Sequence, residues 1–157
     1  MGVAALFLDR DGVINVRLPD RYVEAWDQFR FRQEFLDAAP GLGRAFPLVV
    51  VVTNQRGVER GYLTEETLNA IHDRMVQEVA VAGGRIDAVY YCPHVECEDR
   101  KPNPGLFLAA ARDHGIDLGA STMVGDQPSD REAAQRAGVG RYVDVGDLAS
   151  LAEGEEP

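Results

Sequence analysis

Short apolar segments that alternate with helical patterns constrain the fold of this chain more than any other feature of the sequence. They lie at residues 3–8, 48–52, 86–91 and 121–124, and a weaker fifth lies at 141–145. Each is four to six residues long and apolar on both faces, as is typical of parallel strands that are buried on both sides of a sheet. We interpret them as strands of one sheet.

Helical patterns fill the intervals between these strands. One helix is predicted from Thr64, as its N-cap, to about Ala82, because apolar residues recur there on one face. Two more are predicted at 103–115 and 128–138, where each pattern starts near a proline and ends at a glycine. The segment before residue 48 predicts only a weak helix, because it contains Pro40, Gly41 and Gly43.

This alternation predicts the fold class. Strands and helices in turn imply right-handed βαβ units, and therefore a Rossmann-like α/β fold in which helices cover both faces of an open parallel sheet. We expect one domain over residues 1–157, with an acidic tail from about residue 150. Ligands of such sheets bind beyond the carboxyl ends of the strands. The long connection 12–33 carries four aromatic residues and is expected to be a lid or a binding loop.

Composition excludes several classes of protein. The 157 residues carry 16 basic and 26 acidic side chains, a formal net charge of −10, which disfavours a nucleic-acid partner. No apolar run reaches the roughly 18 residues of a membrane span. Two cysteines are too few for a secreted disulfide scaffold. We therefore expect a cytoplasmic protein without a membrane or nucleic-acid partner, and a monomer, because no large apolar face is left unassigned.

Two carboxylates follow the first predicted strand. Asp9 and Asp11 stand two residues apart and precede Gly12, and such a pair is stable in a crevice mainly when a cation such as Mg²⁺ neutralises it. Asp9 is a candidate nucleophile toward phosphorus, and Asp11 a candidate general acid or base. An ordinary turn in which Gly12 supplies a positive φ has the same pattern, and this motif alone does not decide between the two.

Polar residues also follow the second and fourth strands. Thr53 and the exposed backbone that follows it are typical of a phosphate cradle. Asp126 stands where a second carboxylate would reach the same cation, and Asp130 is expected one shell further out. Each feature alone also fits an ordinary loop or a helix start, where negative charge is favourable.

Lys101 is the only lysine among sixteen basic residues. It lies between the third strand and the next helix, where a compact ammonium would suit a phosphate oxygen and a nearby carboxylate better than the planar fork of arginine. A surface lysine left by chance is the alternative interpretation.

Taken together, Asp-x-Asp, Thr, Lys and Gly-Asp-x-x-x-Asp at successive strand ends resemble the haloacid dehalogenase superfamily over about residues 3–145. The resemblance implies a phosphatase in which Asp9 forms an aspartyl-phosphate and Asp11 serves as acid and then base. It implies Mg²⁺ held by Asp9, the backbone carbonyl of Asp11, and Asp126. Thr53, Asn54, Gln55, Arg100 and Lys101 would contact the substrate. No inserted cap domain is visible in the sequence, so the expected enzyme is capless.

A second metal site is expected in the run from Tyr90 to Pro102. Cys92, His94 and Cys97 offer soft and borderline ligands at a spacing that favours zinc, with Asp99 as the nearest fourth ligand. Two free thiols are the alternative, and a disulfide between them is not expected in a reducing cytoplasm. The run resembles the structural zinc loop of two phosphatase families, with a shorter spacer and Asp99 in place of the last cysteine.

Those families act on D-glycero-D-manno-heptose 1,7-bisphosphate and on histidinol phosphate. The runs Leu-Asp-Arg-Asp-Gly-Val-Ile-Asn and Thr-Asn-Gln-Arg-Gly-Val-Glu-Arg-Gly-Tyr favour the heptose family. Arg56 and residues 17–21 depart from its usual pattern, so histidinol phosphate or another small phosphomonoester remains an alternative substrate. The fold class also suits a phospho-receiver signalling domain or a catalytically silent binding protein. The receiver would need its acceptor aspartate near residue 54, where this chain has Thr-Asn-Gln.

Overall fold

Five parallel strands form the centre of the computed structural model, which describes residues 2–154. The strand order β3-β2-β1-β4-β5 confirms the predicted open parallel sheet. The strands are β1 (Ala5–Leu8), β2 (Leu48–Asn54), β3 (Ala88–Cys92), β4 (Thr122–Gly125) and β5 (Arg141–Asp144). Strand β2 runs two residues beyond its apolar segment, because Thr53 and Asn54 continue the pairing with β3.

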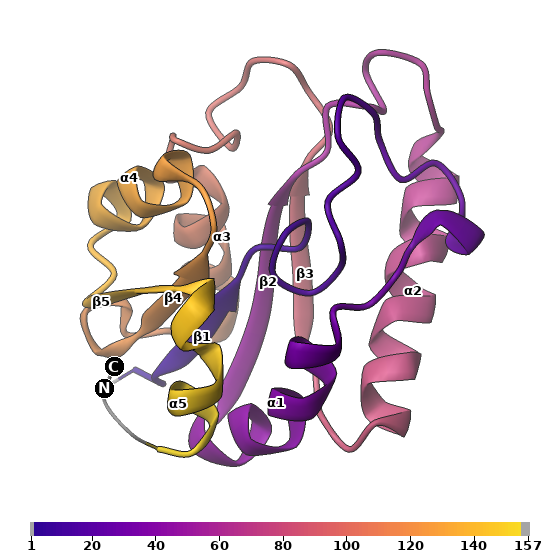
Figure 1. The fold of residues 1–157 in the computed structure, drawn as a ribbon. Helices are drawn as coiled ribbons and strands as arrows, with labels where there is room; N and C mark the ends of the chain where they lie inside the picture. The colour runs from indigo at the N-terminus through magenta and orange to yellow at the C-terminus, as the bar shows by residue number, and fades with distance from the viewer. Residues whose placement is uncertain (1, 155–157) are drawn as a thin grey trace.

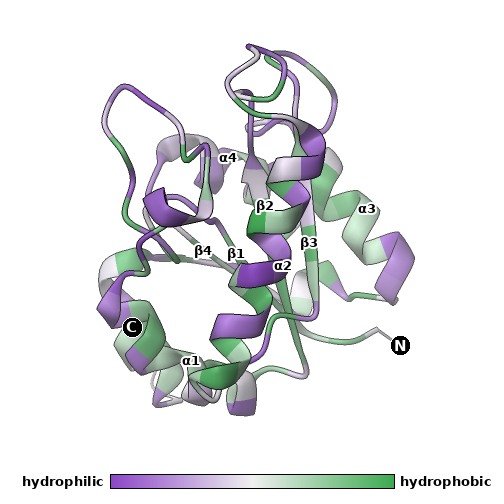
Figure 2. Cartoon of the chain, turned by 90° about the vertical axis from the view of Figure 1, so that its right-hand side faces the viewer, coloured by the Kyte–Doolittle hydropathy of each residue, from purple (hydrophilic) through white to green (hydrophobic). Residues whose placement is uncertain are grey.

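Helices cover both faces of the sheet (Figure 1). They are α1 (Gln33–Ala45), α2 (Glu65–Val81), α3 (Gly105–His114), α4 (Pro128–Ala137) and α5 (Leu148–Ala152), with short 3-10 turns at Trp26–Gln28, Leu118–Ala120 and Val145–Asp147. Alternate residues of β1 enter two separate cores. Leu6 and Leu8 join the core beneath α1, α2 and α5, whereas Ala5 and Phe7 join the core beneath α3 and α4. Figure 2 shows the alternation of apolar and polar residues along α2.

The predicted helix ends are largely confirmed. The hydroxyl of Thr64 accepts a hydrogen bond of 3.0 Å from the backbone N–H of Thr67 at the start of α2. Gly115 and Gly138 end α3 and α4 with φ values of 64° and 86°, in the left-handed region that glycine adopts without strain. Helix α3 begins one residue later than predicted, because the Asn103 side chain donates to the carbonyl of Cys97 instead of capping the helix.

Helix α1 corrects the expectation of a weak helix, because it runs unbroken over 13 residues with Pro40 inside. Its buried face, which includes Phe35 and Leu42, packs on the sheet. Gly41 serves a further purpose, since a Cβ atom there would lie 2.4 Å from the carbonyl oxygen of Ala152 in α5. The low helix propensity of Pro40, Gly41 and Gly43 is therefore overridden by the packing of α1 on the sheet and by its close contact with α5.

The long connection between β1 and α1 is ordered by its aromatic residues. The rings of Trp26 and Phe29 stack at 4.9 Å, and Phe31 meets Phe29 edge-on at 5.1 Å. From this base the segment 17–22 rises above the carboxyl ends of the strands, beside the loop that follows β2 (Figure 1). Within the described part of the chain we find no inserted cap domain, and none of its helices is long and apolar enough to cross a membrane.

Candidate active site

A pocket of about 580 Å³ opens beyond the carboxyl ends of β1 and β2. The sheet order places β4 beside β1 and on the side away from β2, so the chain reverses its winding direction at β1. Such a switch point leaves a crevice between the diverging loops, where ligands of open α/β sheets bind. The pocket is lined at its floor by Asp9, Asp11, Thr53 and Lys101, and further out by residues of the 17–22 segment.

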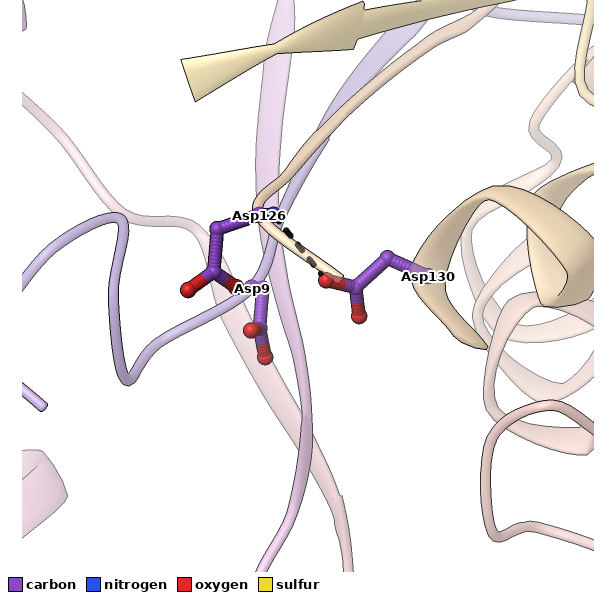
Figure 3. A group of neighbouring side chains, drawn as sticks. All are labelled: Asp9, Asp126 and Asp130. Atoms are coloured by element: carbon purple, nitrogen blue, oxygen red, sulfur yellow. Dashed lines mark hydrogen bonds between the residues drawn. The ribbon is translucent and has the colours of Figure 1, made fainter. Parts of the chain in front are cut away.

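Three carboxylates meet at this switch point, and they come from the end of β1, the end of β4 and the first turn of α4. Asp9, Asp126 and Asp130 each offer an oxygen within 4.8 Å of the others, and they form the one such group of three possible metal ligands among the described residues (Figure 3). Gly12 permits this approach. A Cβ atom at Gly12 would lie 1.9 Å from Oδ2 of Asp126, so only a residue without a side chain lets Asp126 lie against the loop that follows β1.

The oxygen atoms around this position suit a cation. Nη2 of Arg17 lies 2.8 Å from the carbonyl oxygen of Asp11 and 3.1 and 3.2 Å from the two carboxylate oxygens of Asp126. It also lies 3.8 Å from Oδ2 of Asp9. A set composed only of oxygen atoms is the donor set that Mg²⁺ prefers, and the guanidinium shows that this set accommodates a positive charge.

Lys101 is buried at the floor of the pocket with three acceptors. Its ammonium lies 2.8 Å from Oδ1 of Asp9, 2.5 Å from Oδ1 of Asp130 and 3.1 Å from the carbonyl oxygen of Val52. Burial by itself would lower the pKa of Lys101, but the charges of Asp9 and Asp130 raise it above its usual value. The lysine is therefore charged and fixed in one position.

Asp130 holds the lysine and the start of α4 at the same time. Its Oδ1 atom accepts from Lys101, and its Oδ2 atom accepts from the backbone N–H groups of Asp126 and Gln127, both at 3.1 Å. With both oxygens engaged, Asp130 orients Lys101 and the β4–α4 turn. The sequence predicts that Asp130 lies one shell outside the metal ligands, whereas its hydrogen bond with Lys101 is seen only in the structure.

Asp11 is held as a carboxylate by three donors. Arg10 and Asn15 donate to Oδ1, and Gln55 donates to Oδ2, each at 2.9 Å. Burial opposes ionisation, but the Arg10 charge and these hydrogen bonds lower the pKa of Asp11 to about 2. For Asp9, burial dominates over the opposing effect of Lys101 and raises the pKa. The two aspartates of the motif therefore lie in different electrostatic environments.

A buried contact between Arg10 and His72 lies beneath Asp11, and the sequence does not predict it. The Arg10 side chain is 1% exposed and donates from Nη1 to Nε2 of His72 at 3.0 Å. Burial and the Arg10 charge lower the pKa of His72 to about 3, against a smaller raising effect of Asp11. Because Arg10 stands between Asp9 and Asp11 in the sequence, an ion pair between Arg10 and one of these aspartates could have been predicted. No local sequence pattern indicates that Arg10 also contacts His72 on α2.

The residues at the end of β2 and just beyond it bind one another as well as lining the pocket. Gln55 donates from Nε2 to Oγ1 of Thr53 at 2.9 Å and so joins Thr53 to Asp11. The Asn54 side chain forms a reciprocal pair with the backbone of Lys101, with distances of 2.9 and 3.1 Å. The Asn54 side chain thus fixes the lysine loop to the end of β2, and the hydroxyl of Thr53 lies in the floor of the pocket.

Three arginines gather at the outer part of the pocket. Arg56 and Arg60 both donate to the hydroxyl of Tyr22, at 3.1 and 2.8 Å. Burial and the charges of Arg56 and Arg60 lower the pKa of Arg100, and its Nη1 atom is buried with no hydrogen-bond partner among the described residues. None of the three forms a salt bridge within residues 2–154. This cationic cluster is suited to an anion.

The cysteine loop corrects one expectation. The structure joins Cys92 and Cys97 as a disulfide, whereas the sequence predicts none. Cys92 is buried at the end of β3. The carbonyl of Cys97 accepts hydrogen bonds from the Arg100 backbone and the Asn103 side chain. These contacts bring the two cysteines together. His94 contacts Glu59 at 3.5 Å instead. The four predicted zinc ligands do not form a cluster within the described residues.

Known proteins resemble this chain over most of its length. A HAD-hydrolase-like family model matches residues 98–142. A D-glycero-alpha-D-manno-heptose-1,7-bisphosphate 7-phosphatase of Burkholderia mallei is 46% identical over 87% of this chain and 76% of its own length. A D-glycero-beta-D-manno-heptose-1,7-bisphosphate 7-phosphatase of Vibrio cholerae is 42% identical over 91% of this chain and 81% of its own length.

Solved structures agree with these sequence relatives. The D,D-heptose 1,7-bisphosphate phosphatase of B. bronchiseptica, crystallised with magnesium and phosphate, superposes with a TM-score of 0.85 at 35% identity, covering 96% of this chain and 97% of that one. The D,D-heptose 1,7-bisphosphate phosphatase of Burkholderia thailandensis superposes with a TM-score of 0.69 at 30% identity, covering 96% and 97%.

Proposed function

Because this chain belongs to the D-glycero-D-manno-heptose-1,7-bisphosphate 7-phosphatase family of the haloacid dehalogenase superfamily, as its motifs predict, we propose that it removes the 7-phosphate of this sugar bisphosphate in a Mg²⁺-dependent reaction. The observation that carries the proposal is the arrangement at the switch point. There Asp9 lies against the Lys101 ammonium on one side and Asp126 on the other.

In the proposed reaction Asp9 is the nucleophile. Its carboxylate, which is held by Lys101 through Oδ1, attacks phosphorus, and an aspartyl-phosphate forms as the bond from phosphorus to the sugar oxygen breaks. Asp9, Asp126 and the carbonyl of Asp11 would hold Mg²⁺, which when bound neutralises negative charge on the phosphoryl oxygens. The Thr53 hydroxyl, the backbone around Asn54 and Lys101 bind the same oxygens.

Asp11 transfers the proton in both halves of the proposed reaction. Its low pKa makes it ionised in the free protein, and the arriving phosphate dianion raises that pKa so that Asp11 takes up a proton. Asp11 then protonates the departing sugar oxygen. In the second half its carboxylate takes a proton from the water that attacks phosphorus, and the bond between phosphorus and Asp9 breaks to release phosphate.

The arginine cluster supports a substrate with a second phosphate. Arg56, Arg60 and Arg100 line the same pocket as Asp9, and the buried, unpartnered Nη1 atom of Arg100 among the described residues would gain an acceptor. Arginine binds phosphate by paired hydrogen bonds. We therefore propose that the phosphate which is not hydrolysed binds here, with Arg100 as its inner contact.

A phosphate-release assay with Mg²⁺ tests this proposal. The substrates are both anomers of heptose 1,7-bisphosphate, heptose 7-phosphate, histidinol phosphate and fructose 1,6-bisphosphate. We expect the highest kcat/KM for one anomer of the heptose bisphosphate, and both anomers are needed because relatives of either specificity resemble the chain. Preference for histidinol phosphate, or no preference among the five, would refute the substrate assignment and leave the reaction class intact.

Replacement of the nucleophile tests the reaction class. Asp9→Asn should lower turnover by at least about 10⁴-fold, because an amide is not a nucleophile toward phosphorus. The folded state should persist, since the amide remains close in size to the carboxylate and still accepts from Lys101. Turnover within tenfold of the wild type, with an unchanged circular dichroism spectrum, would refute the aspartyl-phosphate mechanism.

We also propose that, where the thiols of a reducing cytoplasm reduce the Cys92–Cys97 disulfide to two thiols, the cysteine loop binds structural zinc. The two sulfurs that the structure brings together supply two ligands, and His94 and Asp99, both exposed, would supply the others after a side-chain rotation. Elemental analysis of protein purified without chelator should find one zinc per chain, and denaturation without reductant should free two thiols. No zinc and no free thiol would refute the zinc site and show that the disulfide persists.

A further inference from the structure

We propose that Arg17 occupies the magnesium position in the metal-free protein, so that metal binding displaces Arg17 and releases the segment 17–22 that lines the substrate pocket. This inference rests on the proposed function, because it takes the magnesium ligands from there. It adds a positioning residue that couples the metal site to the shape of the pocket.

The geometry places one nitrogen atom where the ion would lie. Nη2 of Arg17 contacts the carbonyl oxygen of Asp11 at 2.8 Å, both carboxylate oxygens of Asp126 at 3.1 and 3.2 Å, and Oδ2 of Asp9 at 3.8 Å. These three groups are the three protein ligands proposed for Mg²⁺. A single arginine atom thus donates hydrogen bonds to Asp11 and Asp126 and lies within ion-pair distance of Asp9.

Arg17 and the ion exclude each other. Mg²⁺ holds its oxygens at about 2.0–2.1 Å in a strict octahedron, and it would need the same lone pairs to which the guanidinium now donates. Two cations on one set of carboxylates also repel each other at short range. The metal-free protein with Arg17 bound and the metal-bound protein with Arg17 withdrawn are therefore two distinct states.

The segment that carries Arg17 has few backbone contacts that would oppose its movement. The Arg17 side chain is 45% exposed. Apart from the turn at Pro19 and Asp20, the segment 17–22 makes no backbone-to-backbone hydrogen bond with the rest of residues 2–154. Besides the contacts of Arg17, Leu18 packs partly buried against the hydrophobic core, and further hydrogen bonds hold the segment near its ends. Val16 donates from its backbone to the carbonyl of Arg30 at 2.8 Å, and the Tyr22 hydroxyl accepts from Arg56 and Arg60. Withdrawal of Arg17 therefore leaves the sheet undisturbed.

The same segment forms the wall of the pocket from Leu18 to Tyr22. Metal binding frees this wall and the Arg17 guanidinium, and phosphate attracts the freed guanidinium. Binding of the metal and binding of phosphate therefore favour each other. Thermodynamic linkage requires the coupling to be reciprocal. Inorganic phosphate should accordingly tighten Mg²⁺ binding more in the wild type than in a variant without Arg17.

Metal binding by calorimetry, without turnover, tests the inference. Arg17→Gln removes the competing cation, and Arg21→Gln is the matched control, since it changes the net charge equally from the same segment and Arg21 forms no salt bridge in the described chain. If one protein molecule in ten has Arg17 withdrawn, Arg17→Gln should tighten Mg²⁺ binding about tenfold, and Arg21→Gln less than twofold. Equal affinities of the two variants, or weaker binding by Arg17→Gln, would overturn the inference.

Arginine-selective labelling gives a second readout. Phenylglyoxal modification followed by peptide mass spectrometry should show that saturating Mg²⁺ speeds modification of Arg17 and leaves Arg21 unchanged. An unchanged Arg17 rate would overturn the inference. Asp126→Asn separates this failure from that of the proposed function, because wild-type Mg²⁺ affinity in Asp126→Asn would show that the metal site itself is wrongly assigned.

Discussion

Lys101 shows how a single charge can be buried in an α/β core. Its side chain is 2% exposed, yet each of its three N–H donors has an acceptor in Asp9, Asp130 or Val52. A buried ion is tolerated only when it is paired and fully hydrogen-bonded. The fixed ammonium also keeps two carboxylates close together that would otherwise repel each other.

Substitutions of Lys101 should therefore cost both stability and turnover. Lys101→Met leaves Asp9 and Asp130 buried without their cation, and we expect a loss of about 3–5 kcal/mol in the free energy of unfolding. Lys101→Arg keeps the charge, but its planar fork does not fit three acceptors around one point, so turnover should fall at least about 100-fold. Urea unfolding and phosphate release measure the two effects, and wild-type turnover in Lys101→Arg would contradict this view of the site.

Adding a single methyl group at Gly12 tests the metal site. A Cβ atom there would lie 1.9 Å from Asp126, whereas a Cβ atom at Gly61 would meet nothing within 4 Å, although both glycines have a positive φ. Gly12→Ala and Gly61→Ala should both lose about 1 kcal/mol of stability from backbone strain. Only Gly12→Ala should lose Mg²⁺ binding by calorimetry, and equal Mg²⁺ affinity in both variants would contradict the assigned role of Asp126.

At the scale of elements, α1 illustrates two opposite uses of glycine in one helix. Gly41 lies under the carbonyl of Ala152, at 2.4 Å from an added Cβ, whereas the nearest atom at Gly43 would be an Arg85 nitrogen at 3.6 Å. Gly41→Ala should push α5 away and lower the free energy of unfolding by about 1–3 kcal/mol. Gly43→Ala should raise it by roughly 0.5–1 kcal/mol, because alanine is the better helix former. Thermal unfolding distinguishes the signs, and the same sign for both would be inconsistent with the α1–α5 contact.

Helix α2 contributes the buried His72, which should make stability depend on pH. Its pKa is about 3 in the folded protein and about 6.5 in an unfolded chain. Above pH 6.5 the imidazole is neutral in both states and no stability is lost. Between pH 6.5 and 3 only the unfolded chain takes up the proton, so the free energy of unfolding should fall by about 1.4 kcal/mol per pH unit.

The variant His72→Gln isolates this effect. Glutamine still offers an acceptor to Arg10 and does not titrate, so the fall in stability between pH 6.5 and 4 should be smaller by a few kcal/mol than in the wild type. His114→Gln changes an exposed histidine and serves as the control. Parallel stability curves for the wild type and His72→Gln, from urea unfolding at each pH, would contradict the neutral buried state of His72.

At the scale of the whole molecule, the topology distributes the charge. The chain carries a net charge of −10, but the strand order brings Asp9 and Asp126 together at one point of the sheet. The outer part of the pocket that Asp9 lines is cationic through Arg56, Arg60 and Arg100. An anionic protein thus presents a locally positive entrance to an anionic substrate, and such local fields raise the rate at which charged ligands bind.

The sequence by itself determined the alternation of strands and helices, most helix ends and the order of the polar strand ends. These depend on local chemistry, namely apolar periodicity, the capping hydroxyl of Thr64 and glycines with positive φ. It also indicated Asp9, Asp11, Asp126 and Lys101 as one group, because parallel strands end at a common edge.

Only the tertiary structure decided which groups touch. The burial of Arg10 against His72, the bond from Asp130 to Lys101 and the insertion of Arg17 among the carboxylates join residues from different elements. The continuity of α1 through Pro40 and the pairing of the cysteines were likewise decided by packing. The physical reason is that local patterns fix periodicity and end points, whereas the contacts of a side chain depend on which segments the folded sheet brings beside it.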